Sequence, residues 1–137
     1  SPYGSTIYFT SDRGGSPQIY RMSASGGPAQ RVTFSGNYNA GPRISPDGRY
    51  LAYVTTSGGG YQVAVMDLAS GQSHLLGQAT GAERPTFSPN GRMVLFAAKA
   101  DGRDVLIIAS VDGNTRQKLS LPAGKVREPA WGPIQIQ

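Results

Sequence analysis

The sequence contains no cysteine and a single histidine, His74. Without cysteine, disulfide bonds and thiolate metal sites are excluded, and one histidine cannot assemble a His/Cys metal cluster. The chain also lacks a run of about eighteen apolar residues, the length that a membrane-spanning helix needs. Residues 1–9 lack the basic start and the apolar stretch of a signal peptide. We therefore expect no metal, no cofactor and no insertion into a membrane.

Clustered positive charge is missing as well, although the net charge is +5, from 13 lysines and arginines against 8 aspartates and glutamates. The cations are scattered singly between Arg13 and Arg127. Binding to phosphates requires several cations that converge on one face. The distribution therefore argues against a nucleic-acid partner.

Glycine and proline are abundant: the 137 residues include 19 glycines and 10 prolines, which lie between short apolar runs. This pattern is typical of many tight turns that join short strands. With 38% apolar residues the chain can bury a core. The sequence therefore predicts an all-β fold.

A tetrapeptide with turn chemistry recurs along the chain. It reads SPDG at 45–48 and SPNG at 88–91, with a weaker copy at 1–4 and a partial one at Gly132-Pro133. Successive copies begin 44, 43 and 44 residues apart. Proline fixes φ at roughly −65° and glycine accepts positive φ, so each copy favours a tight hairpin turn.

Apolar segments keep the same phase as these turns. Each repeat holds an apolar triplet (7–9, 51–53, 94–96), a second apolar run (19–22, 63–66, 105–108), a third short strand (30–33, 74–76, 117–119) and a closing strand (42–44, 85–87, 129–131). Four short strands at this period are typical of β-propeller blades, whereas a β-sandwich has no reason to repeat its turn chemistry. We predict a β-propeller segment with three four-stranded blade repeats, approximately 1–44, 45–87 and 88–131, followed by a tail at 132–137.

The repeats of the chain are offset by one strand from the expected blades. If the closing strand is the innermost of each blade, the first repeat lacks an inner strand, while Pro129, Ala130 and Trp131 form one that has no blade of its own. An open arc would also expose strand edges and apolar faces. We predict that two chains exchange these strands and close a six-bladed ring as a homodimer. The alternative is a fragment whose other blades are absent.

Polar loops precede the inner strands, where the mouth of the propeller channel is expected. They carry Asn37, Tyr38 and Asn39 in the first repeat, Glu83 and Arg84 in the second, and Arg127 and Glu128 in the third. Charges around an entrance can orient a bound peptide, and an aromatic side chain can anchor it. We expect a partner-binding surface here; the alternative is that these charges are simply solvated.

Catalytic groups are hard to assemble from this sequence. His74 falls on an outer strand, and no G-x-S-x-G nucleophile motif occurs. The glycine runs at 14–15 and 58–60 do not lead into a helix with lysine and threonine, as a phosphate-binding loop would. Asp47 and Asp112 precede glycines and are explained by turns. We therefore expect a protein that is not an enzyme.

Several segments resemble the TolB-like β-propeller family of the Tol-Pal system. They are IYFTSDRGG at 7–15, QIY at 18–20, RVTF at 31–34 and VREPAW at 126–131, with LAY at 51–53 and MDLASG at 66–71. The resemblance covers essentially the whole chain. It implies a six-bladed periplasmic propeller that binds the lipoprotein Pal and translocated toxin peptides at its channel mouth.

Two departures from that family leave other interpretations open. The family's small α/β domain and half of its blades have no counterpart in these 137 residues. An engineered or excised half-propeller, assembling with itself and without a native partner, is one alternative. The other is the gating propeller of a serine peptidase, since prolyl-oligopeptidase-like enzymes carry similar repeats.

Overall fold

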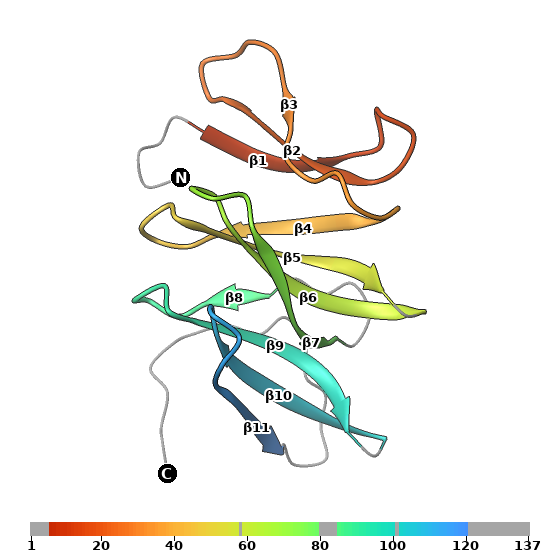
Figure 1. Ribbon diagram of the computed structural model, residues 1–137, viewed down its shortest axis with the longest axis vertical. Helices are drawn as coiled ribbons and strands as arrows, with labels where there is room; N and C mark the ends of the chain where they lie inside the picture. Colours follow the sequence, from red (N-terminus) through yellow and green to blue (C-terminus); the bar gives the residue numbers. More distant parts are fainter. Residues whose placement is uncertain (1–5, 58, 80–84, 101, 121–137) are drawn as a thin grey trace.

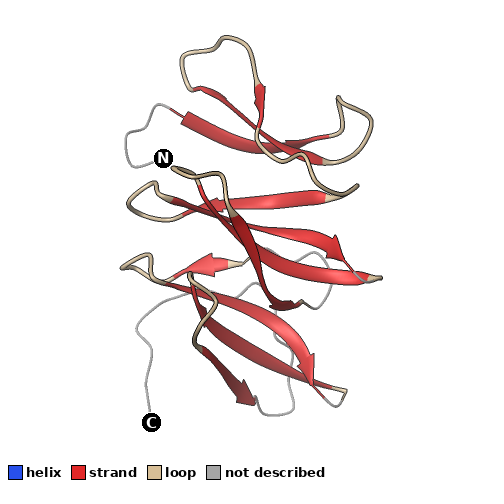
Figure 2. Ribbon diagram, in the orientation of Figure 1, coloured by secondary structure: helices blue, strands red, loops and turns tan. Residues whose placement is uncertain are grey.

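The computed structural model describes residues 6–57, 59–79, 85–100 and 102–120. Every regular element in these ranges is a β-strand, as Figure 2 shows, so none of them is a helix long and apolar enough to cross a membrane. The strands are β1 (Thr6–Ser11), β2 (Gln18–Ser23), β3 (Gln30–Arg31), β4 (Asn39–Ile44), β5 (Tyr50–Ser57), β6 (Gly60–Asp67), β7 (Ser73–Gln78), β8 (Thr86–Phe87), β9 (Met93–Ala100), β10 (Arg103–Ser110) and β11 (Arg116–Ser120). The predicted all-β fold is confirmed for these residues.

The strands form antiparallel sheets that lie one above another along the long axis of the molecule (Figure 1). The first sheet has the order β1-β2-β3, the second β4-β5-β6-β7 and the third β8-β9-β10-β11. Within each sheet, strands that are consecutive in sequence pair with one another, because short connections keep them adjacent.

The turn between β4 and β5 shows what the SPDG sequence does. The Ser45 hydroxyl donates to Asp47 Oδ1 (2.6 Å) and accepts from the Tyr50 amide (2.9 Å). The same Asp47 oxygen accepts from the Arg49 amide (3.1 Å). Gly48 has a φ of 77°, a conformation that glycine adopts at little cost. Side chain and backbone together therefore fix this hairpin locally.

The same turn recurs in two other hairpins. Between β8 and β9, the Ser88 hydroxyl donates to Asn90 Oδ1 (2.7 Å). Between β10 and β11, the Ser110 hydroxyl donates to Asp112 Oδ1 (2.5 Å), although Val111 stands where the other copies have proline. The serine hydroxyl, the Asp or Asn side chain and a glycine with positive φ (77°, 72° and 77°), but not proline, are thus the common elements of the turn.

The second sheet is buried on both faces, which explains the nearly continuous apolar run in β5. Ala52 and Val63 pack against the third sheet, whereas Leu51 and Tyr53 pack against Ile19 of the first sheet. Successive side chains of a strand point to opposite faces, so a strand covered on both sides has no solvent-facing positions in its middle.

β3 is shorter than predicted. It spans Gln30–Arg31, whereas the sequence predicted a strand at 30–33. The Ile19 amide donates to the Thr33 hydroxyl (2.9 Å), so a side chain takes the bond that a strand ladder would use. The segment 129–131, expected as an inner strand, lies outside the described residues.

β1 is the edge strand of the first sheet. It pairs with β2 alone among the described strands, whereas β5 and β9 each pair on both sides. Ile7 of β1 is 47% exposed, while Leu51 and Val94, at the same place in the other repeats, are 0% exposed. Leu51 and Val94 are buried because each packs against the preceding sheet. Ile7 alternates with Tyr8, which faces the second sheet, so Ile7 lies on the opposite face of the first sheet, which no described sheet covers.

Candidate functional site

Connections between strands meet at one end of the first two sheets, on the right of Figure 1. Asn39, the first residue of β4, pairs with Thr55 near the end of β5, so the connection before β4 lies beside the β5–β6 hairpin. The Asn39 amide also donates to the Pro17 carbonyl (2.9 Å), which brings in the β1–β2 connection. We call residues 12–17, 32–38 and 59–61 the loop-end surface.

A buried polar network holds the longest of these connections, residues 32–38. Gln18 is 0% exposed, and its Oε1 accepts from the Thr33 hydroxyl (2.7 Å) and from Asn39 Nδ2 (2.9 Å). Its Nε2 donates to the Gly36 carbonyl (3.0 Å), and Asn39 Nδ2 donates also to the Ser35 carbonyl (2.8 Å). Satisfied buried networks of this kind rigidify the segments that they join.

The outer side of the same connection presents aromatic groups. Phe34 is 71% exposed, and the Arg31 guanidinium lies 5.1 Å from the centre of its ring. Tyr38 is half-buried and meets Tyr61 of β6 edge to face, with ring centres 5.7 Å apart. Asn37 is exposed between them in sequence. A rigid backbone therefore carries large side chains that contact solvent.

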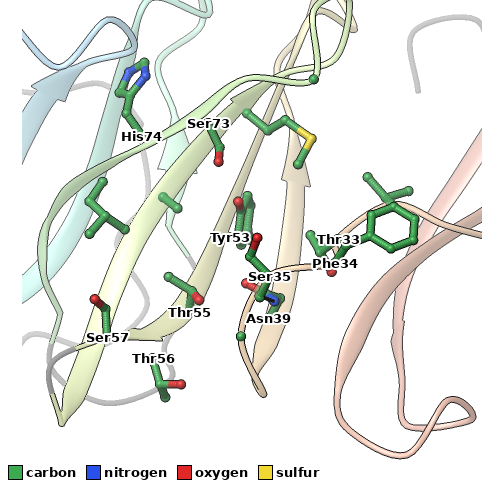
Figure 3. Close-up of a pocket in the computed structure, with 16 residues that line it drawn as sticks. Thr33, Phe34, Ser35, Asn39, Tyr53, Thr55, Thr56, Ser57, Ser73 and His74 are labelled. Atoms are coloured by element: carbon green, nitrogen blue, oxygen red, sulfur yellow. Dashed lines mark hydrogen bonds between the residues drawn. The ribbon is translucent and has the colours of Figure 1, made fainter.

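A groove of about 380 Å³ lies between residues 32–36 and the second sheet. Figure 3 shows side chains that line it: Thr33, Phe34, Ser35, Asn39, Tyr53, Thr55, Thr56, Ser57, Ser73 and His74. Burial raises the pKa of the Tyr53 phenol, although a hydrogen bond with Ser73 opposes that shift. Hydroxyl groups predominate and no charged Asp, Glu, Lys or Arg side chain of the described residues lines the groove, so it suits polar neutral groups.

His74 has a packing role at the margin of this groove. Its Nε2 lies 2.6 Å from the Val111 carbonyl oxygen. Because a carbonyl oxygen only accepts, this ring nitrogen carries the hydrogen. The bond joins the second sheet to the β10–β11 turn of the third.

The carboxylates of the turns show no arrangement for catalysis. Hydrogen bonds, first from Ser45, lower the pKa of Asp47, and those from Ser110 lower the pKa of Asp112. Both groups are therefore stable as turn-forming anions. Within the described ranges, no three His, Asp or Glu side chains lie close enough to hold a metal ion.

The predicted binding residues fall into two groups. The loop-end surface contains Asn37 and Tyr38, while Asn39 follows it with a buried side chain that holds the loop from inside. Outside the described residues lie Glu83, Arg84, Arg127, Glu128, Pro129, Ala130 and Trp131. Sequence reasoning missed Phe34 and Tyr61; an apolar residue in the polar stretch after a strand was the available signal for Phe34.

Comparisons with known proteins agree on one family. Residues 1–135 match the family described as the TolB beta propeller domain. The chain is 57% identical over 84 residues to the Tol-Pal system protein TolB of Azoarcus sp., covering 61% of this chain and 20% of that protein. It is 50% identical over 134 residues to the Tol-Pal system protein TolB of Bordetella pertussis, covering 98% and 31%.

Solved structures point the same way. The crystal structure of TolB from Acinetobacter baumannii superposes with a TM-score of 0.88 at 45% identity, over 96% of this chain and 33% of that one. The chain thus spans about a third, or less, of the length of these three relatives. The tricorn protease is also similar, with a TM-score of 0.63, but at 12% identity it shares the fold alone.

Proposed function

This chain belongs to the TolB β-propeller family, and from that premise we propose that it is a non-catalytic, protein-binding propeller segment of the Tol-Pal system. The partner, for which Pal is our candidate, docks on the loop-end surface. A natural chain of this kind would act in the periplasm. The gating role of a peptidase propeller has weaker support, because the likeness to the tricorn protease extends to the fold only.

The observation that carries this proposal is the pairing of exposed aromatic groups with a rigid backbone. Phe34 is 71% exposed, and Tyr38 packs on Tyr61, while Gln18 fixes the backbone behind them through several buried hydrogen bonds. Aromatic anchors dominate the energetics of protein interfaces, and a preformed loop avoids the entropic cost of ordering on binding. The surface therefore has the two properties that partner docking needs.

We propose that charged residues outside the described ranges complete this surface. Glu83, Arg84, Arg127 and Glu128 precede the segments predicted as inner strands, as Asn37 and Tyr38 do. We propose that these charges set the orientation of the partner and the rate of association, since rim charges act mainly on those properties.

Substitution of Phe34 by alanine tests the docking surface. We expect Phe34→Ala to weaken binding of purified Pal by about ten-fold, because truncation of an anchor costs more than about 1 kcal/mol. Leu119→Ala is the matched control: Leu119 is also exposed, at 40%, but lies on β11 of the third sheet. Isothermal titration calorimetry measures the affinity of both variants and of the parent chain for Pal. Equal affinity of the Phe34 variant and the parent chain would refute docking at this surface.

We also propose that the open edge of β1 receives an inner strand made of Pro129, Ala130 and Trp131 from a second copy. The support is twofold. β1 has β2 as its one partner among the described strands, and Ile7 is 47% exposed on the face of the first sheet that a further blade would cover, as neighbouring sheets cover Leu51 and Val94. In the second sheet Ile44 of β4 pairs with Leu51. By the repeat interval, Trp131 would pair with Ile7, and two chains would close a six-bladed homodimer.

The absence of cysteine makes this register directly testable. Ile7→Cys combined with Trp131→Cys should give a disulfide-linked dimer on oxidation, since such a bond needs Cα atoms within about 7 Å. Ile7→Cys with Gln135→Cys is the off-register control. Light scattering of the parent chain should give twice 14.4 kDa. A mass of 14.4 kDa, or a disulfide within one chain, would refute the dimer.

A further inference from the structure

A cationic groove on the outer rim of the second and third sheets uses none of the residues of the loop-end surface. Its volume is about 380 Å³, and it is lined by Gln62, Gly77, Gln78, Ala98, Lys99, Val105, Ile107, Arg116 and Lys118. Ala98, Val105 and Ile107 form a buried apolar floor. Lys99, Arg116 and Lys118 bring three positive charges to it, and no carboxylate of the described residues lines it.

Two of these cations stand side by side on an edge strand. β11 ends the third sheet, with β10 as its one partner among the described strands (Figure 1). Arg116 pairs with Ala109, and Lys118 pairs with Ile107. Residues directly opposite in a sheet share a face, so both cations project toward the side that packs on the second sheet. Residues two apart on a strand lie about 7 Å from each other.

The Arg116 guanidinium is held in place by a bulge in β7. Val63 pairs with Gly77 and Ala64 with Leu75, so Leu76 has no counterpart on β6. The Leu76 carbonyl instead accepts from Arg116 Nη1 (3.3 Å). A Cβ on Gly77 would stand 2.9 Å from that nitrogen, so glycine is what lets the guanidinium lie against the backbone.

The remaining donors of this cluster have few partners. Lys99 binds Asp104 (2.9 Å) and is thereby balanced. Lys118 and the other N–H groups of Arg116 bond to nothing in the described part of the chain. Two unbalanced cations thus border an open strand edge. They would repel a second copy of β11 and would attract a strand that carries carboxylates.

We propose that β11 accepts an extended acidic segment of a partner protein, with carboxylates two residues apart that lie opposite Arg116 and Lys118. Main-chain hydrogen bonds to a sheet edge supply affinity in this mode of recognition, and alternate side chains supply specificity. Cβ atoms of directly opposite residues lie about 5 Å apart, within reach of a charge pair. The proposal is independent of docking at the loop-end surface.

Short labelled peptides test this site on the full chain. A peptide that alternates Glu and Thr should bind, and binding should weaken when NaCl is raised from about 0.05 M to about 0.5 M because salt screens the charge pairs. The same peptide with Gln for Glu should not bind. A peptide of the same composition with its glutamates in one block should bind less tightly, since alternate glutamates alone share a face.

Variants of the two cations locate the interaction. Arg116→Gln and Lys118→Gln should each weaken binding of the alternating peptide about two- to five-fold, and Arg116→Lys should recover part of the loss. Arg92→Gln removes one exposed cation from the β8–β9 turn and is the matched control. Circular dichroism melting confirms that each variant is folded.

Three results would overturn the proposal. Equal weakening by Arg92→Gln would mean that net charge alone attracts the peptide. Equally tight binding of the peptide with its glutamates in one block would mean that the cations bind acidic peptides without strand pairing. Absence of peptide binding, together with self-association of the Lys118 variant, would mean that these cations only protect the edge from aggregation.

Discussion

Replacement of Gln18 by leucine tests whether one buried amide holds residues 32–38 in place. Leucine has a similar bulk, but it removes the bonds to Thr33, Asn39 and Gly36. Thr33 is 3% exposed, so its hydroxyl would lose its acceptor without gaining water. A buried polar group left without a partner costs about 1–3 kcal/mol, and each further lost hydrogen bond about 1 kcal/mol. Apolar burial of leucine offsets part of this, which leaves a net loss of about 2–3 kcal/mol.

Urea denaturation followed by circular dichroism measures this loss as a lower midpoint, and thermal melting should show a decrease of roughly 5–10 °C for a chain of this size. Gln30→Leu is the control, because Gln30 is exposed and its side chain accepts one bond from Arg21; we expect a change within about 0.5 kcal/mol. Hydrogen exchange of the Ile19 amide, which donates to Thr33, should become faster in the Gln18 variant alone. Equal stability of the two variants would refute the reasoning.

Other substitutions test the turns and the core. Hydrogen bonds lower the pKa of Asp47 below its ordinary 3.8. The stability that Asp47 contributes is therefore present above pH 3.8 and is lost as the pH falls through the folded-state pKa. Asp47→Asn, which copies Asn90, should keep the urea midpoint at neutral pH and should reduce the loss of stability below about pH 4. Gly91→Ala places a side chain at a φ of 72° and should lower the free energy of unfolding, measured by urea denaturation, by about 1–2 kcal/mol. Gly60 has neither a positive φ nor close neighbours, so Gly60→Ala should lower it much less. Phe96→Ala removes a ring that is 1% exposed and should cost about 3–5 kcal/mol; a loss below about 1 kcal/mol would contradict its place in the core.

Local chemistry explains why the turns could be predicted from the sequence. The hydrogen bonds of the Ser45 turn, including those of Asp47, join residues within a stretch of six, so they can form without distant contacts. The apolar triplets were predictable for a similar reason, because burial of both faces requires consecutive apolar residues. The turn at Ser110 was recognised as a turn but not as another copy, since Val111 replaces proline.

Contacts between distant residues explain what the sequence did not predict. The end of β3 depends on the Thr33 hydroxyl, which accepts a hydrogen bond from the Ile19 amide 14 residues away in the sequence. The burial of Asn39 depends on Gln18, 21 residues away. No local pattern separates Asn39 from the exposed Asn37, because the side-chain bond that buries Asn39 is made to a residue far away in the sequence. The exposure of Phe34 likewise follows from the path that this network imposes on the loop.

The recurring serine turns bear on how the chain acquires its structure. Each one closes over six residues, and within each sheet the strands that are consecutive in sequence pair with one another. Such local contacts cost little loop-closure entropy and form early in folding. We therefore expect the turns to form early, so that substitutions in them have larger folding φ-values than substitutions between the sheets. If the sheets dock on one another late in folding, substitutions in the sheet interfaces should act mainly on the rate of unfolding.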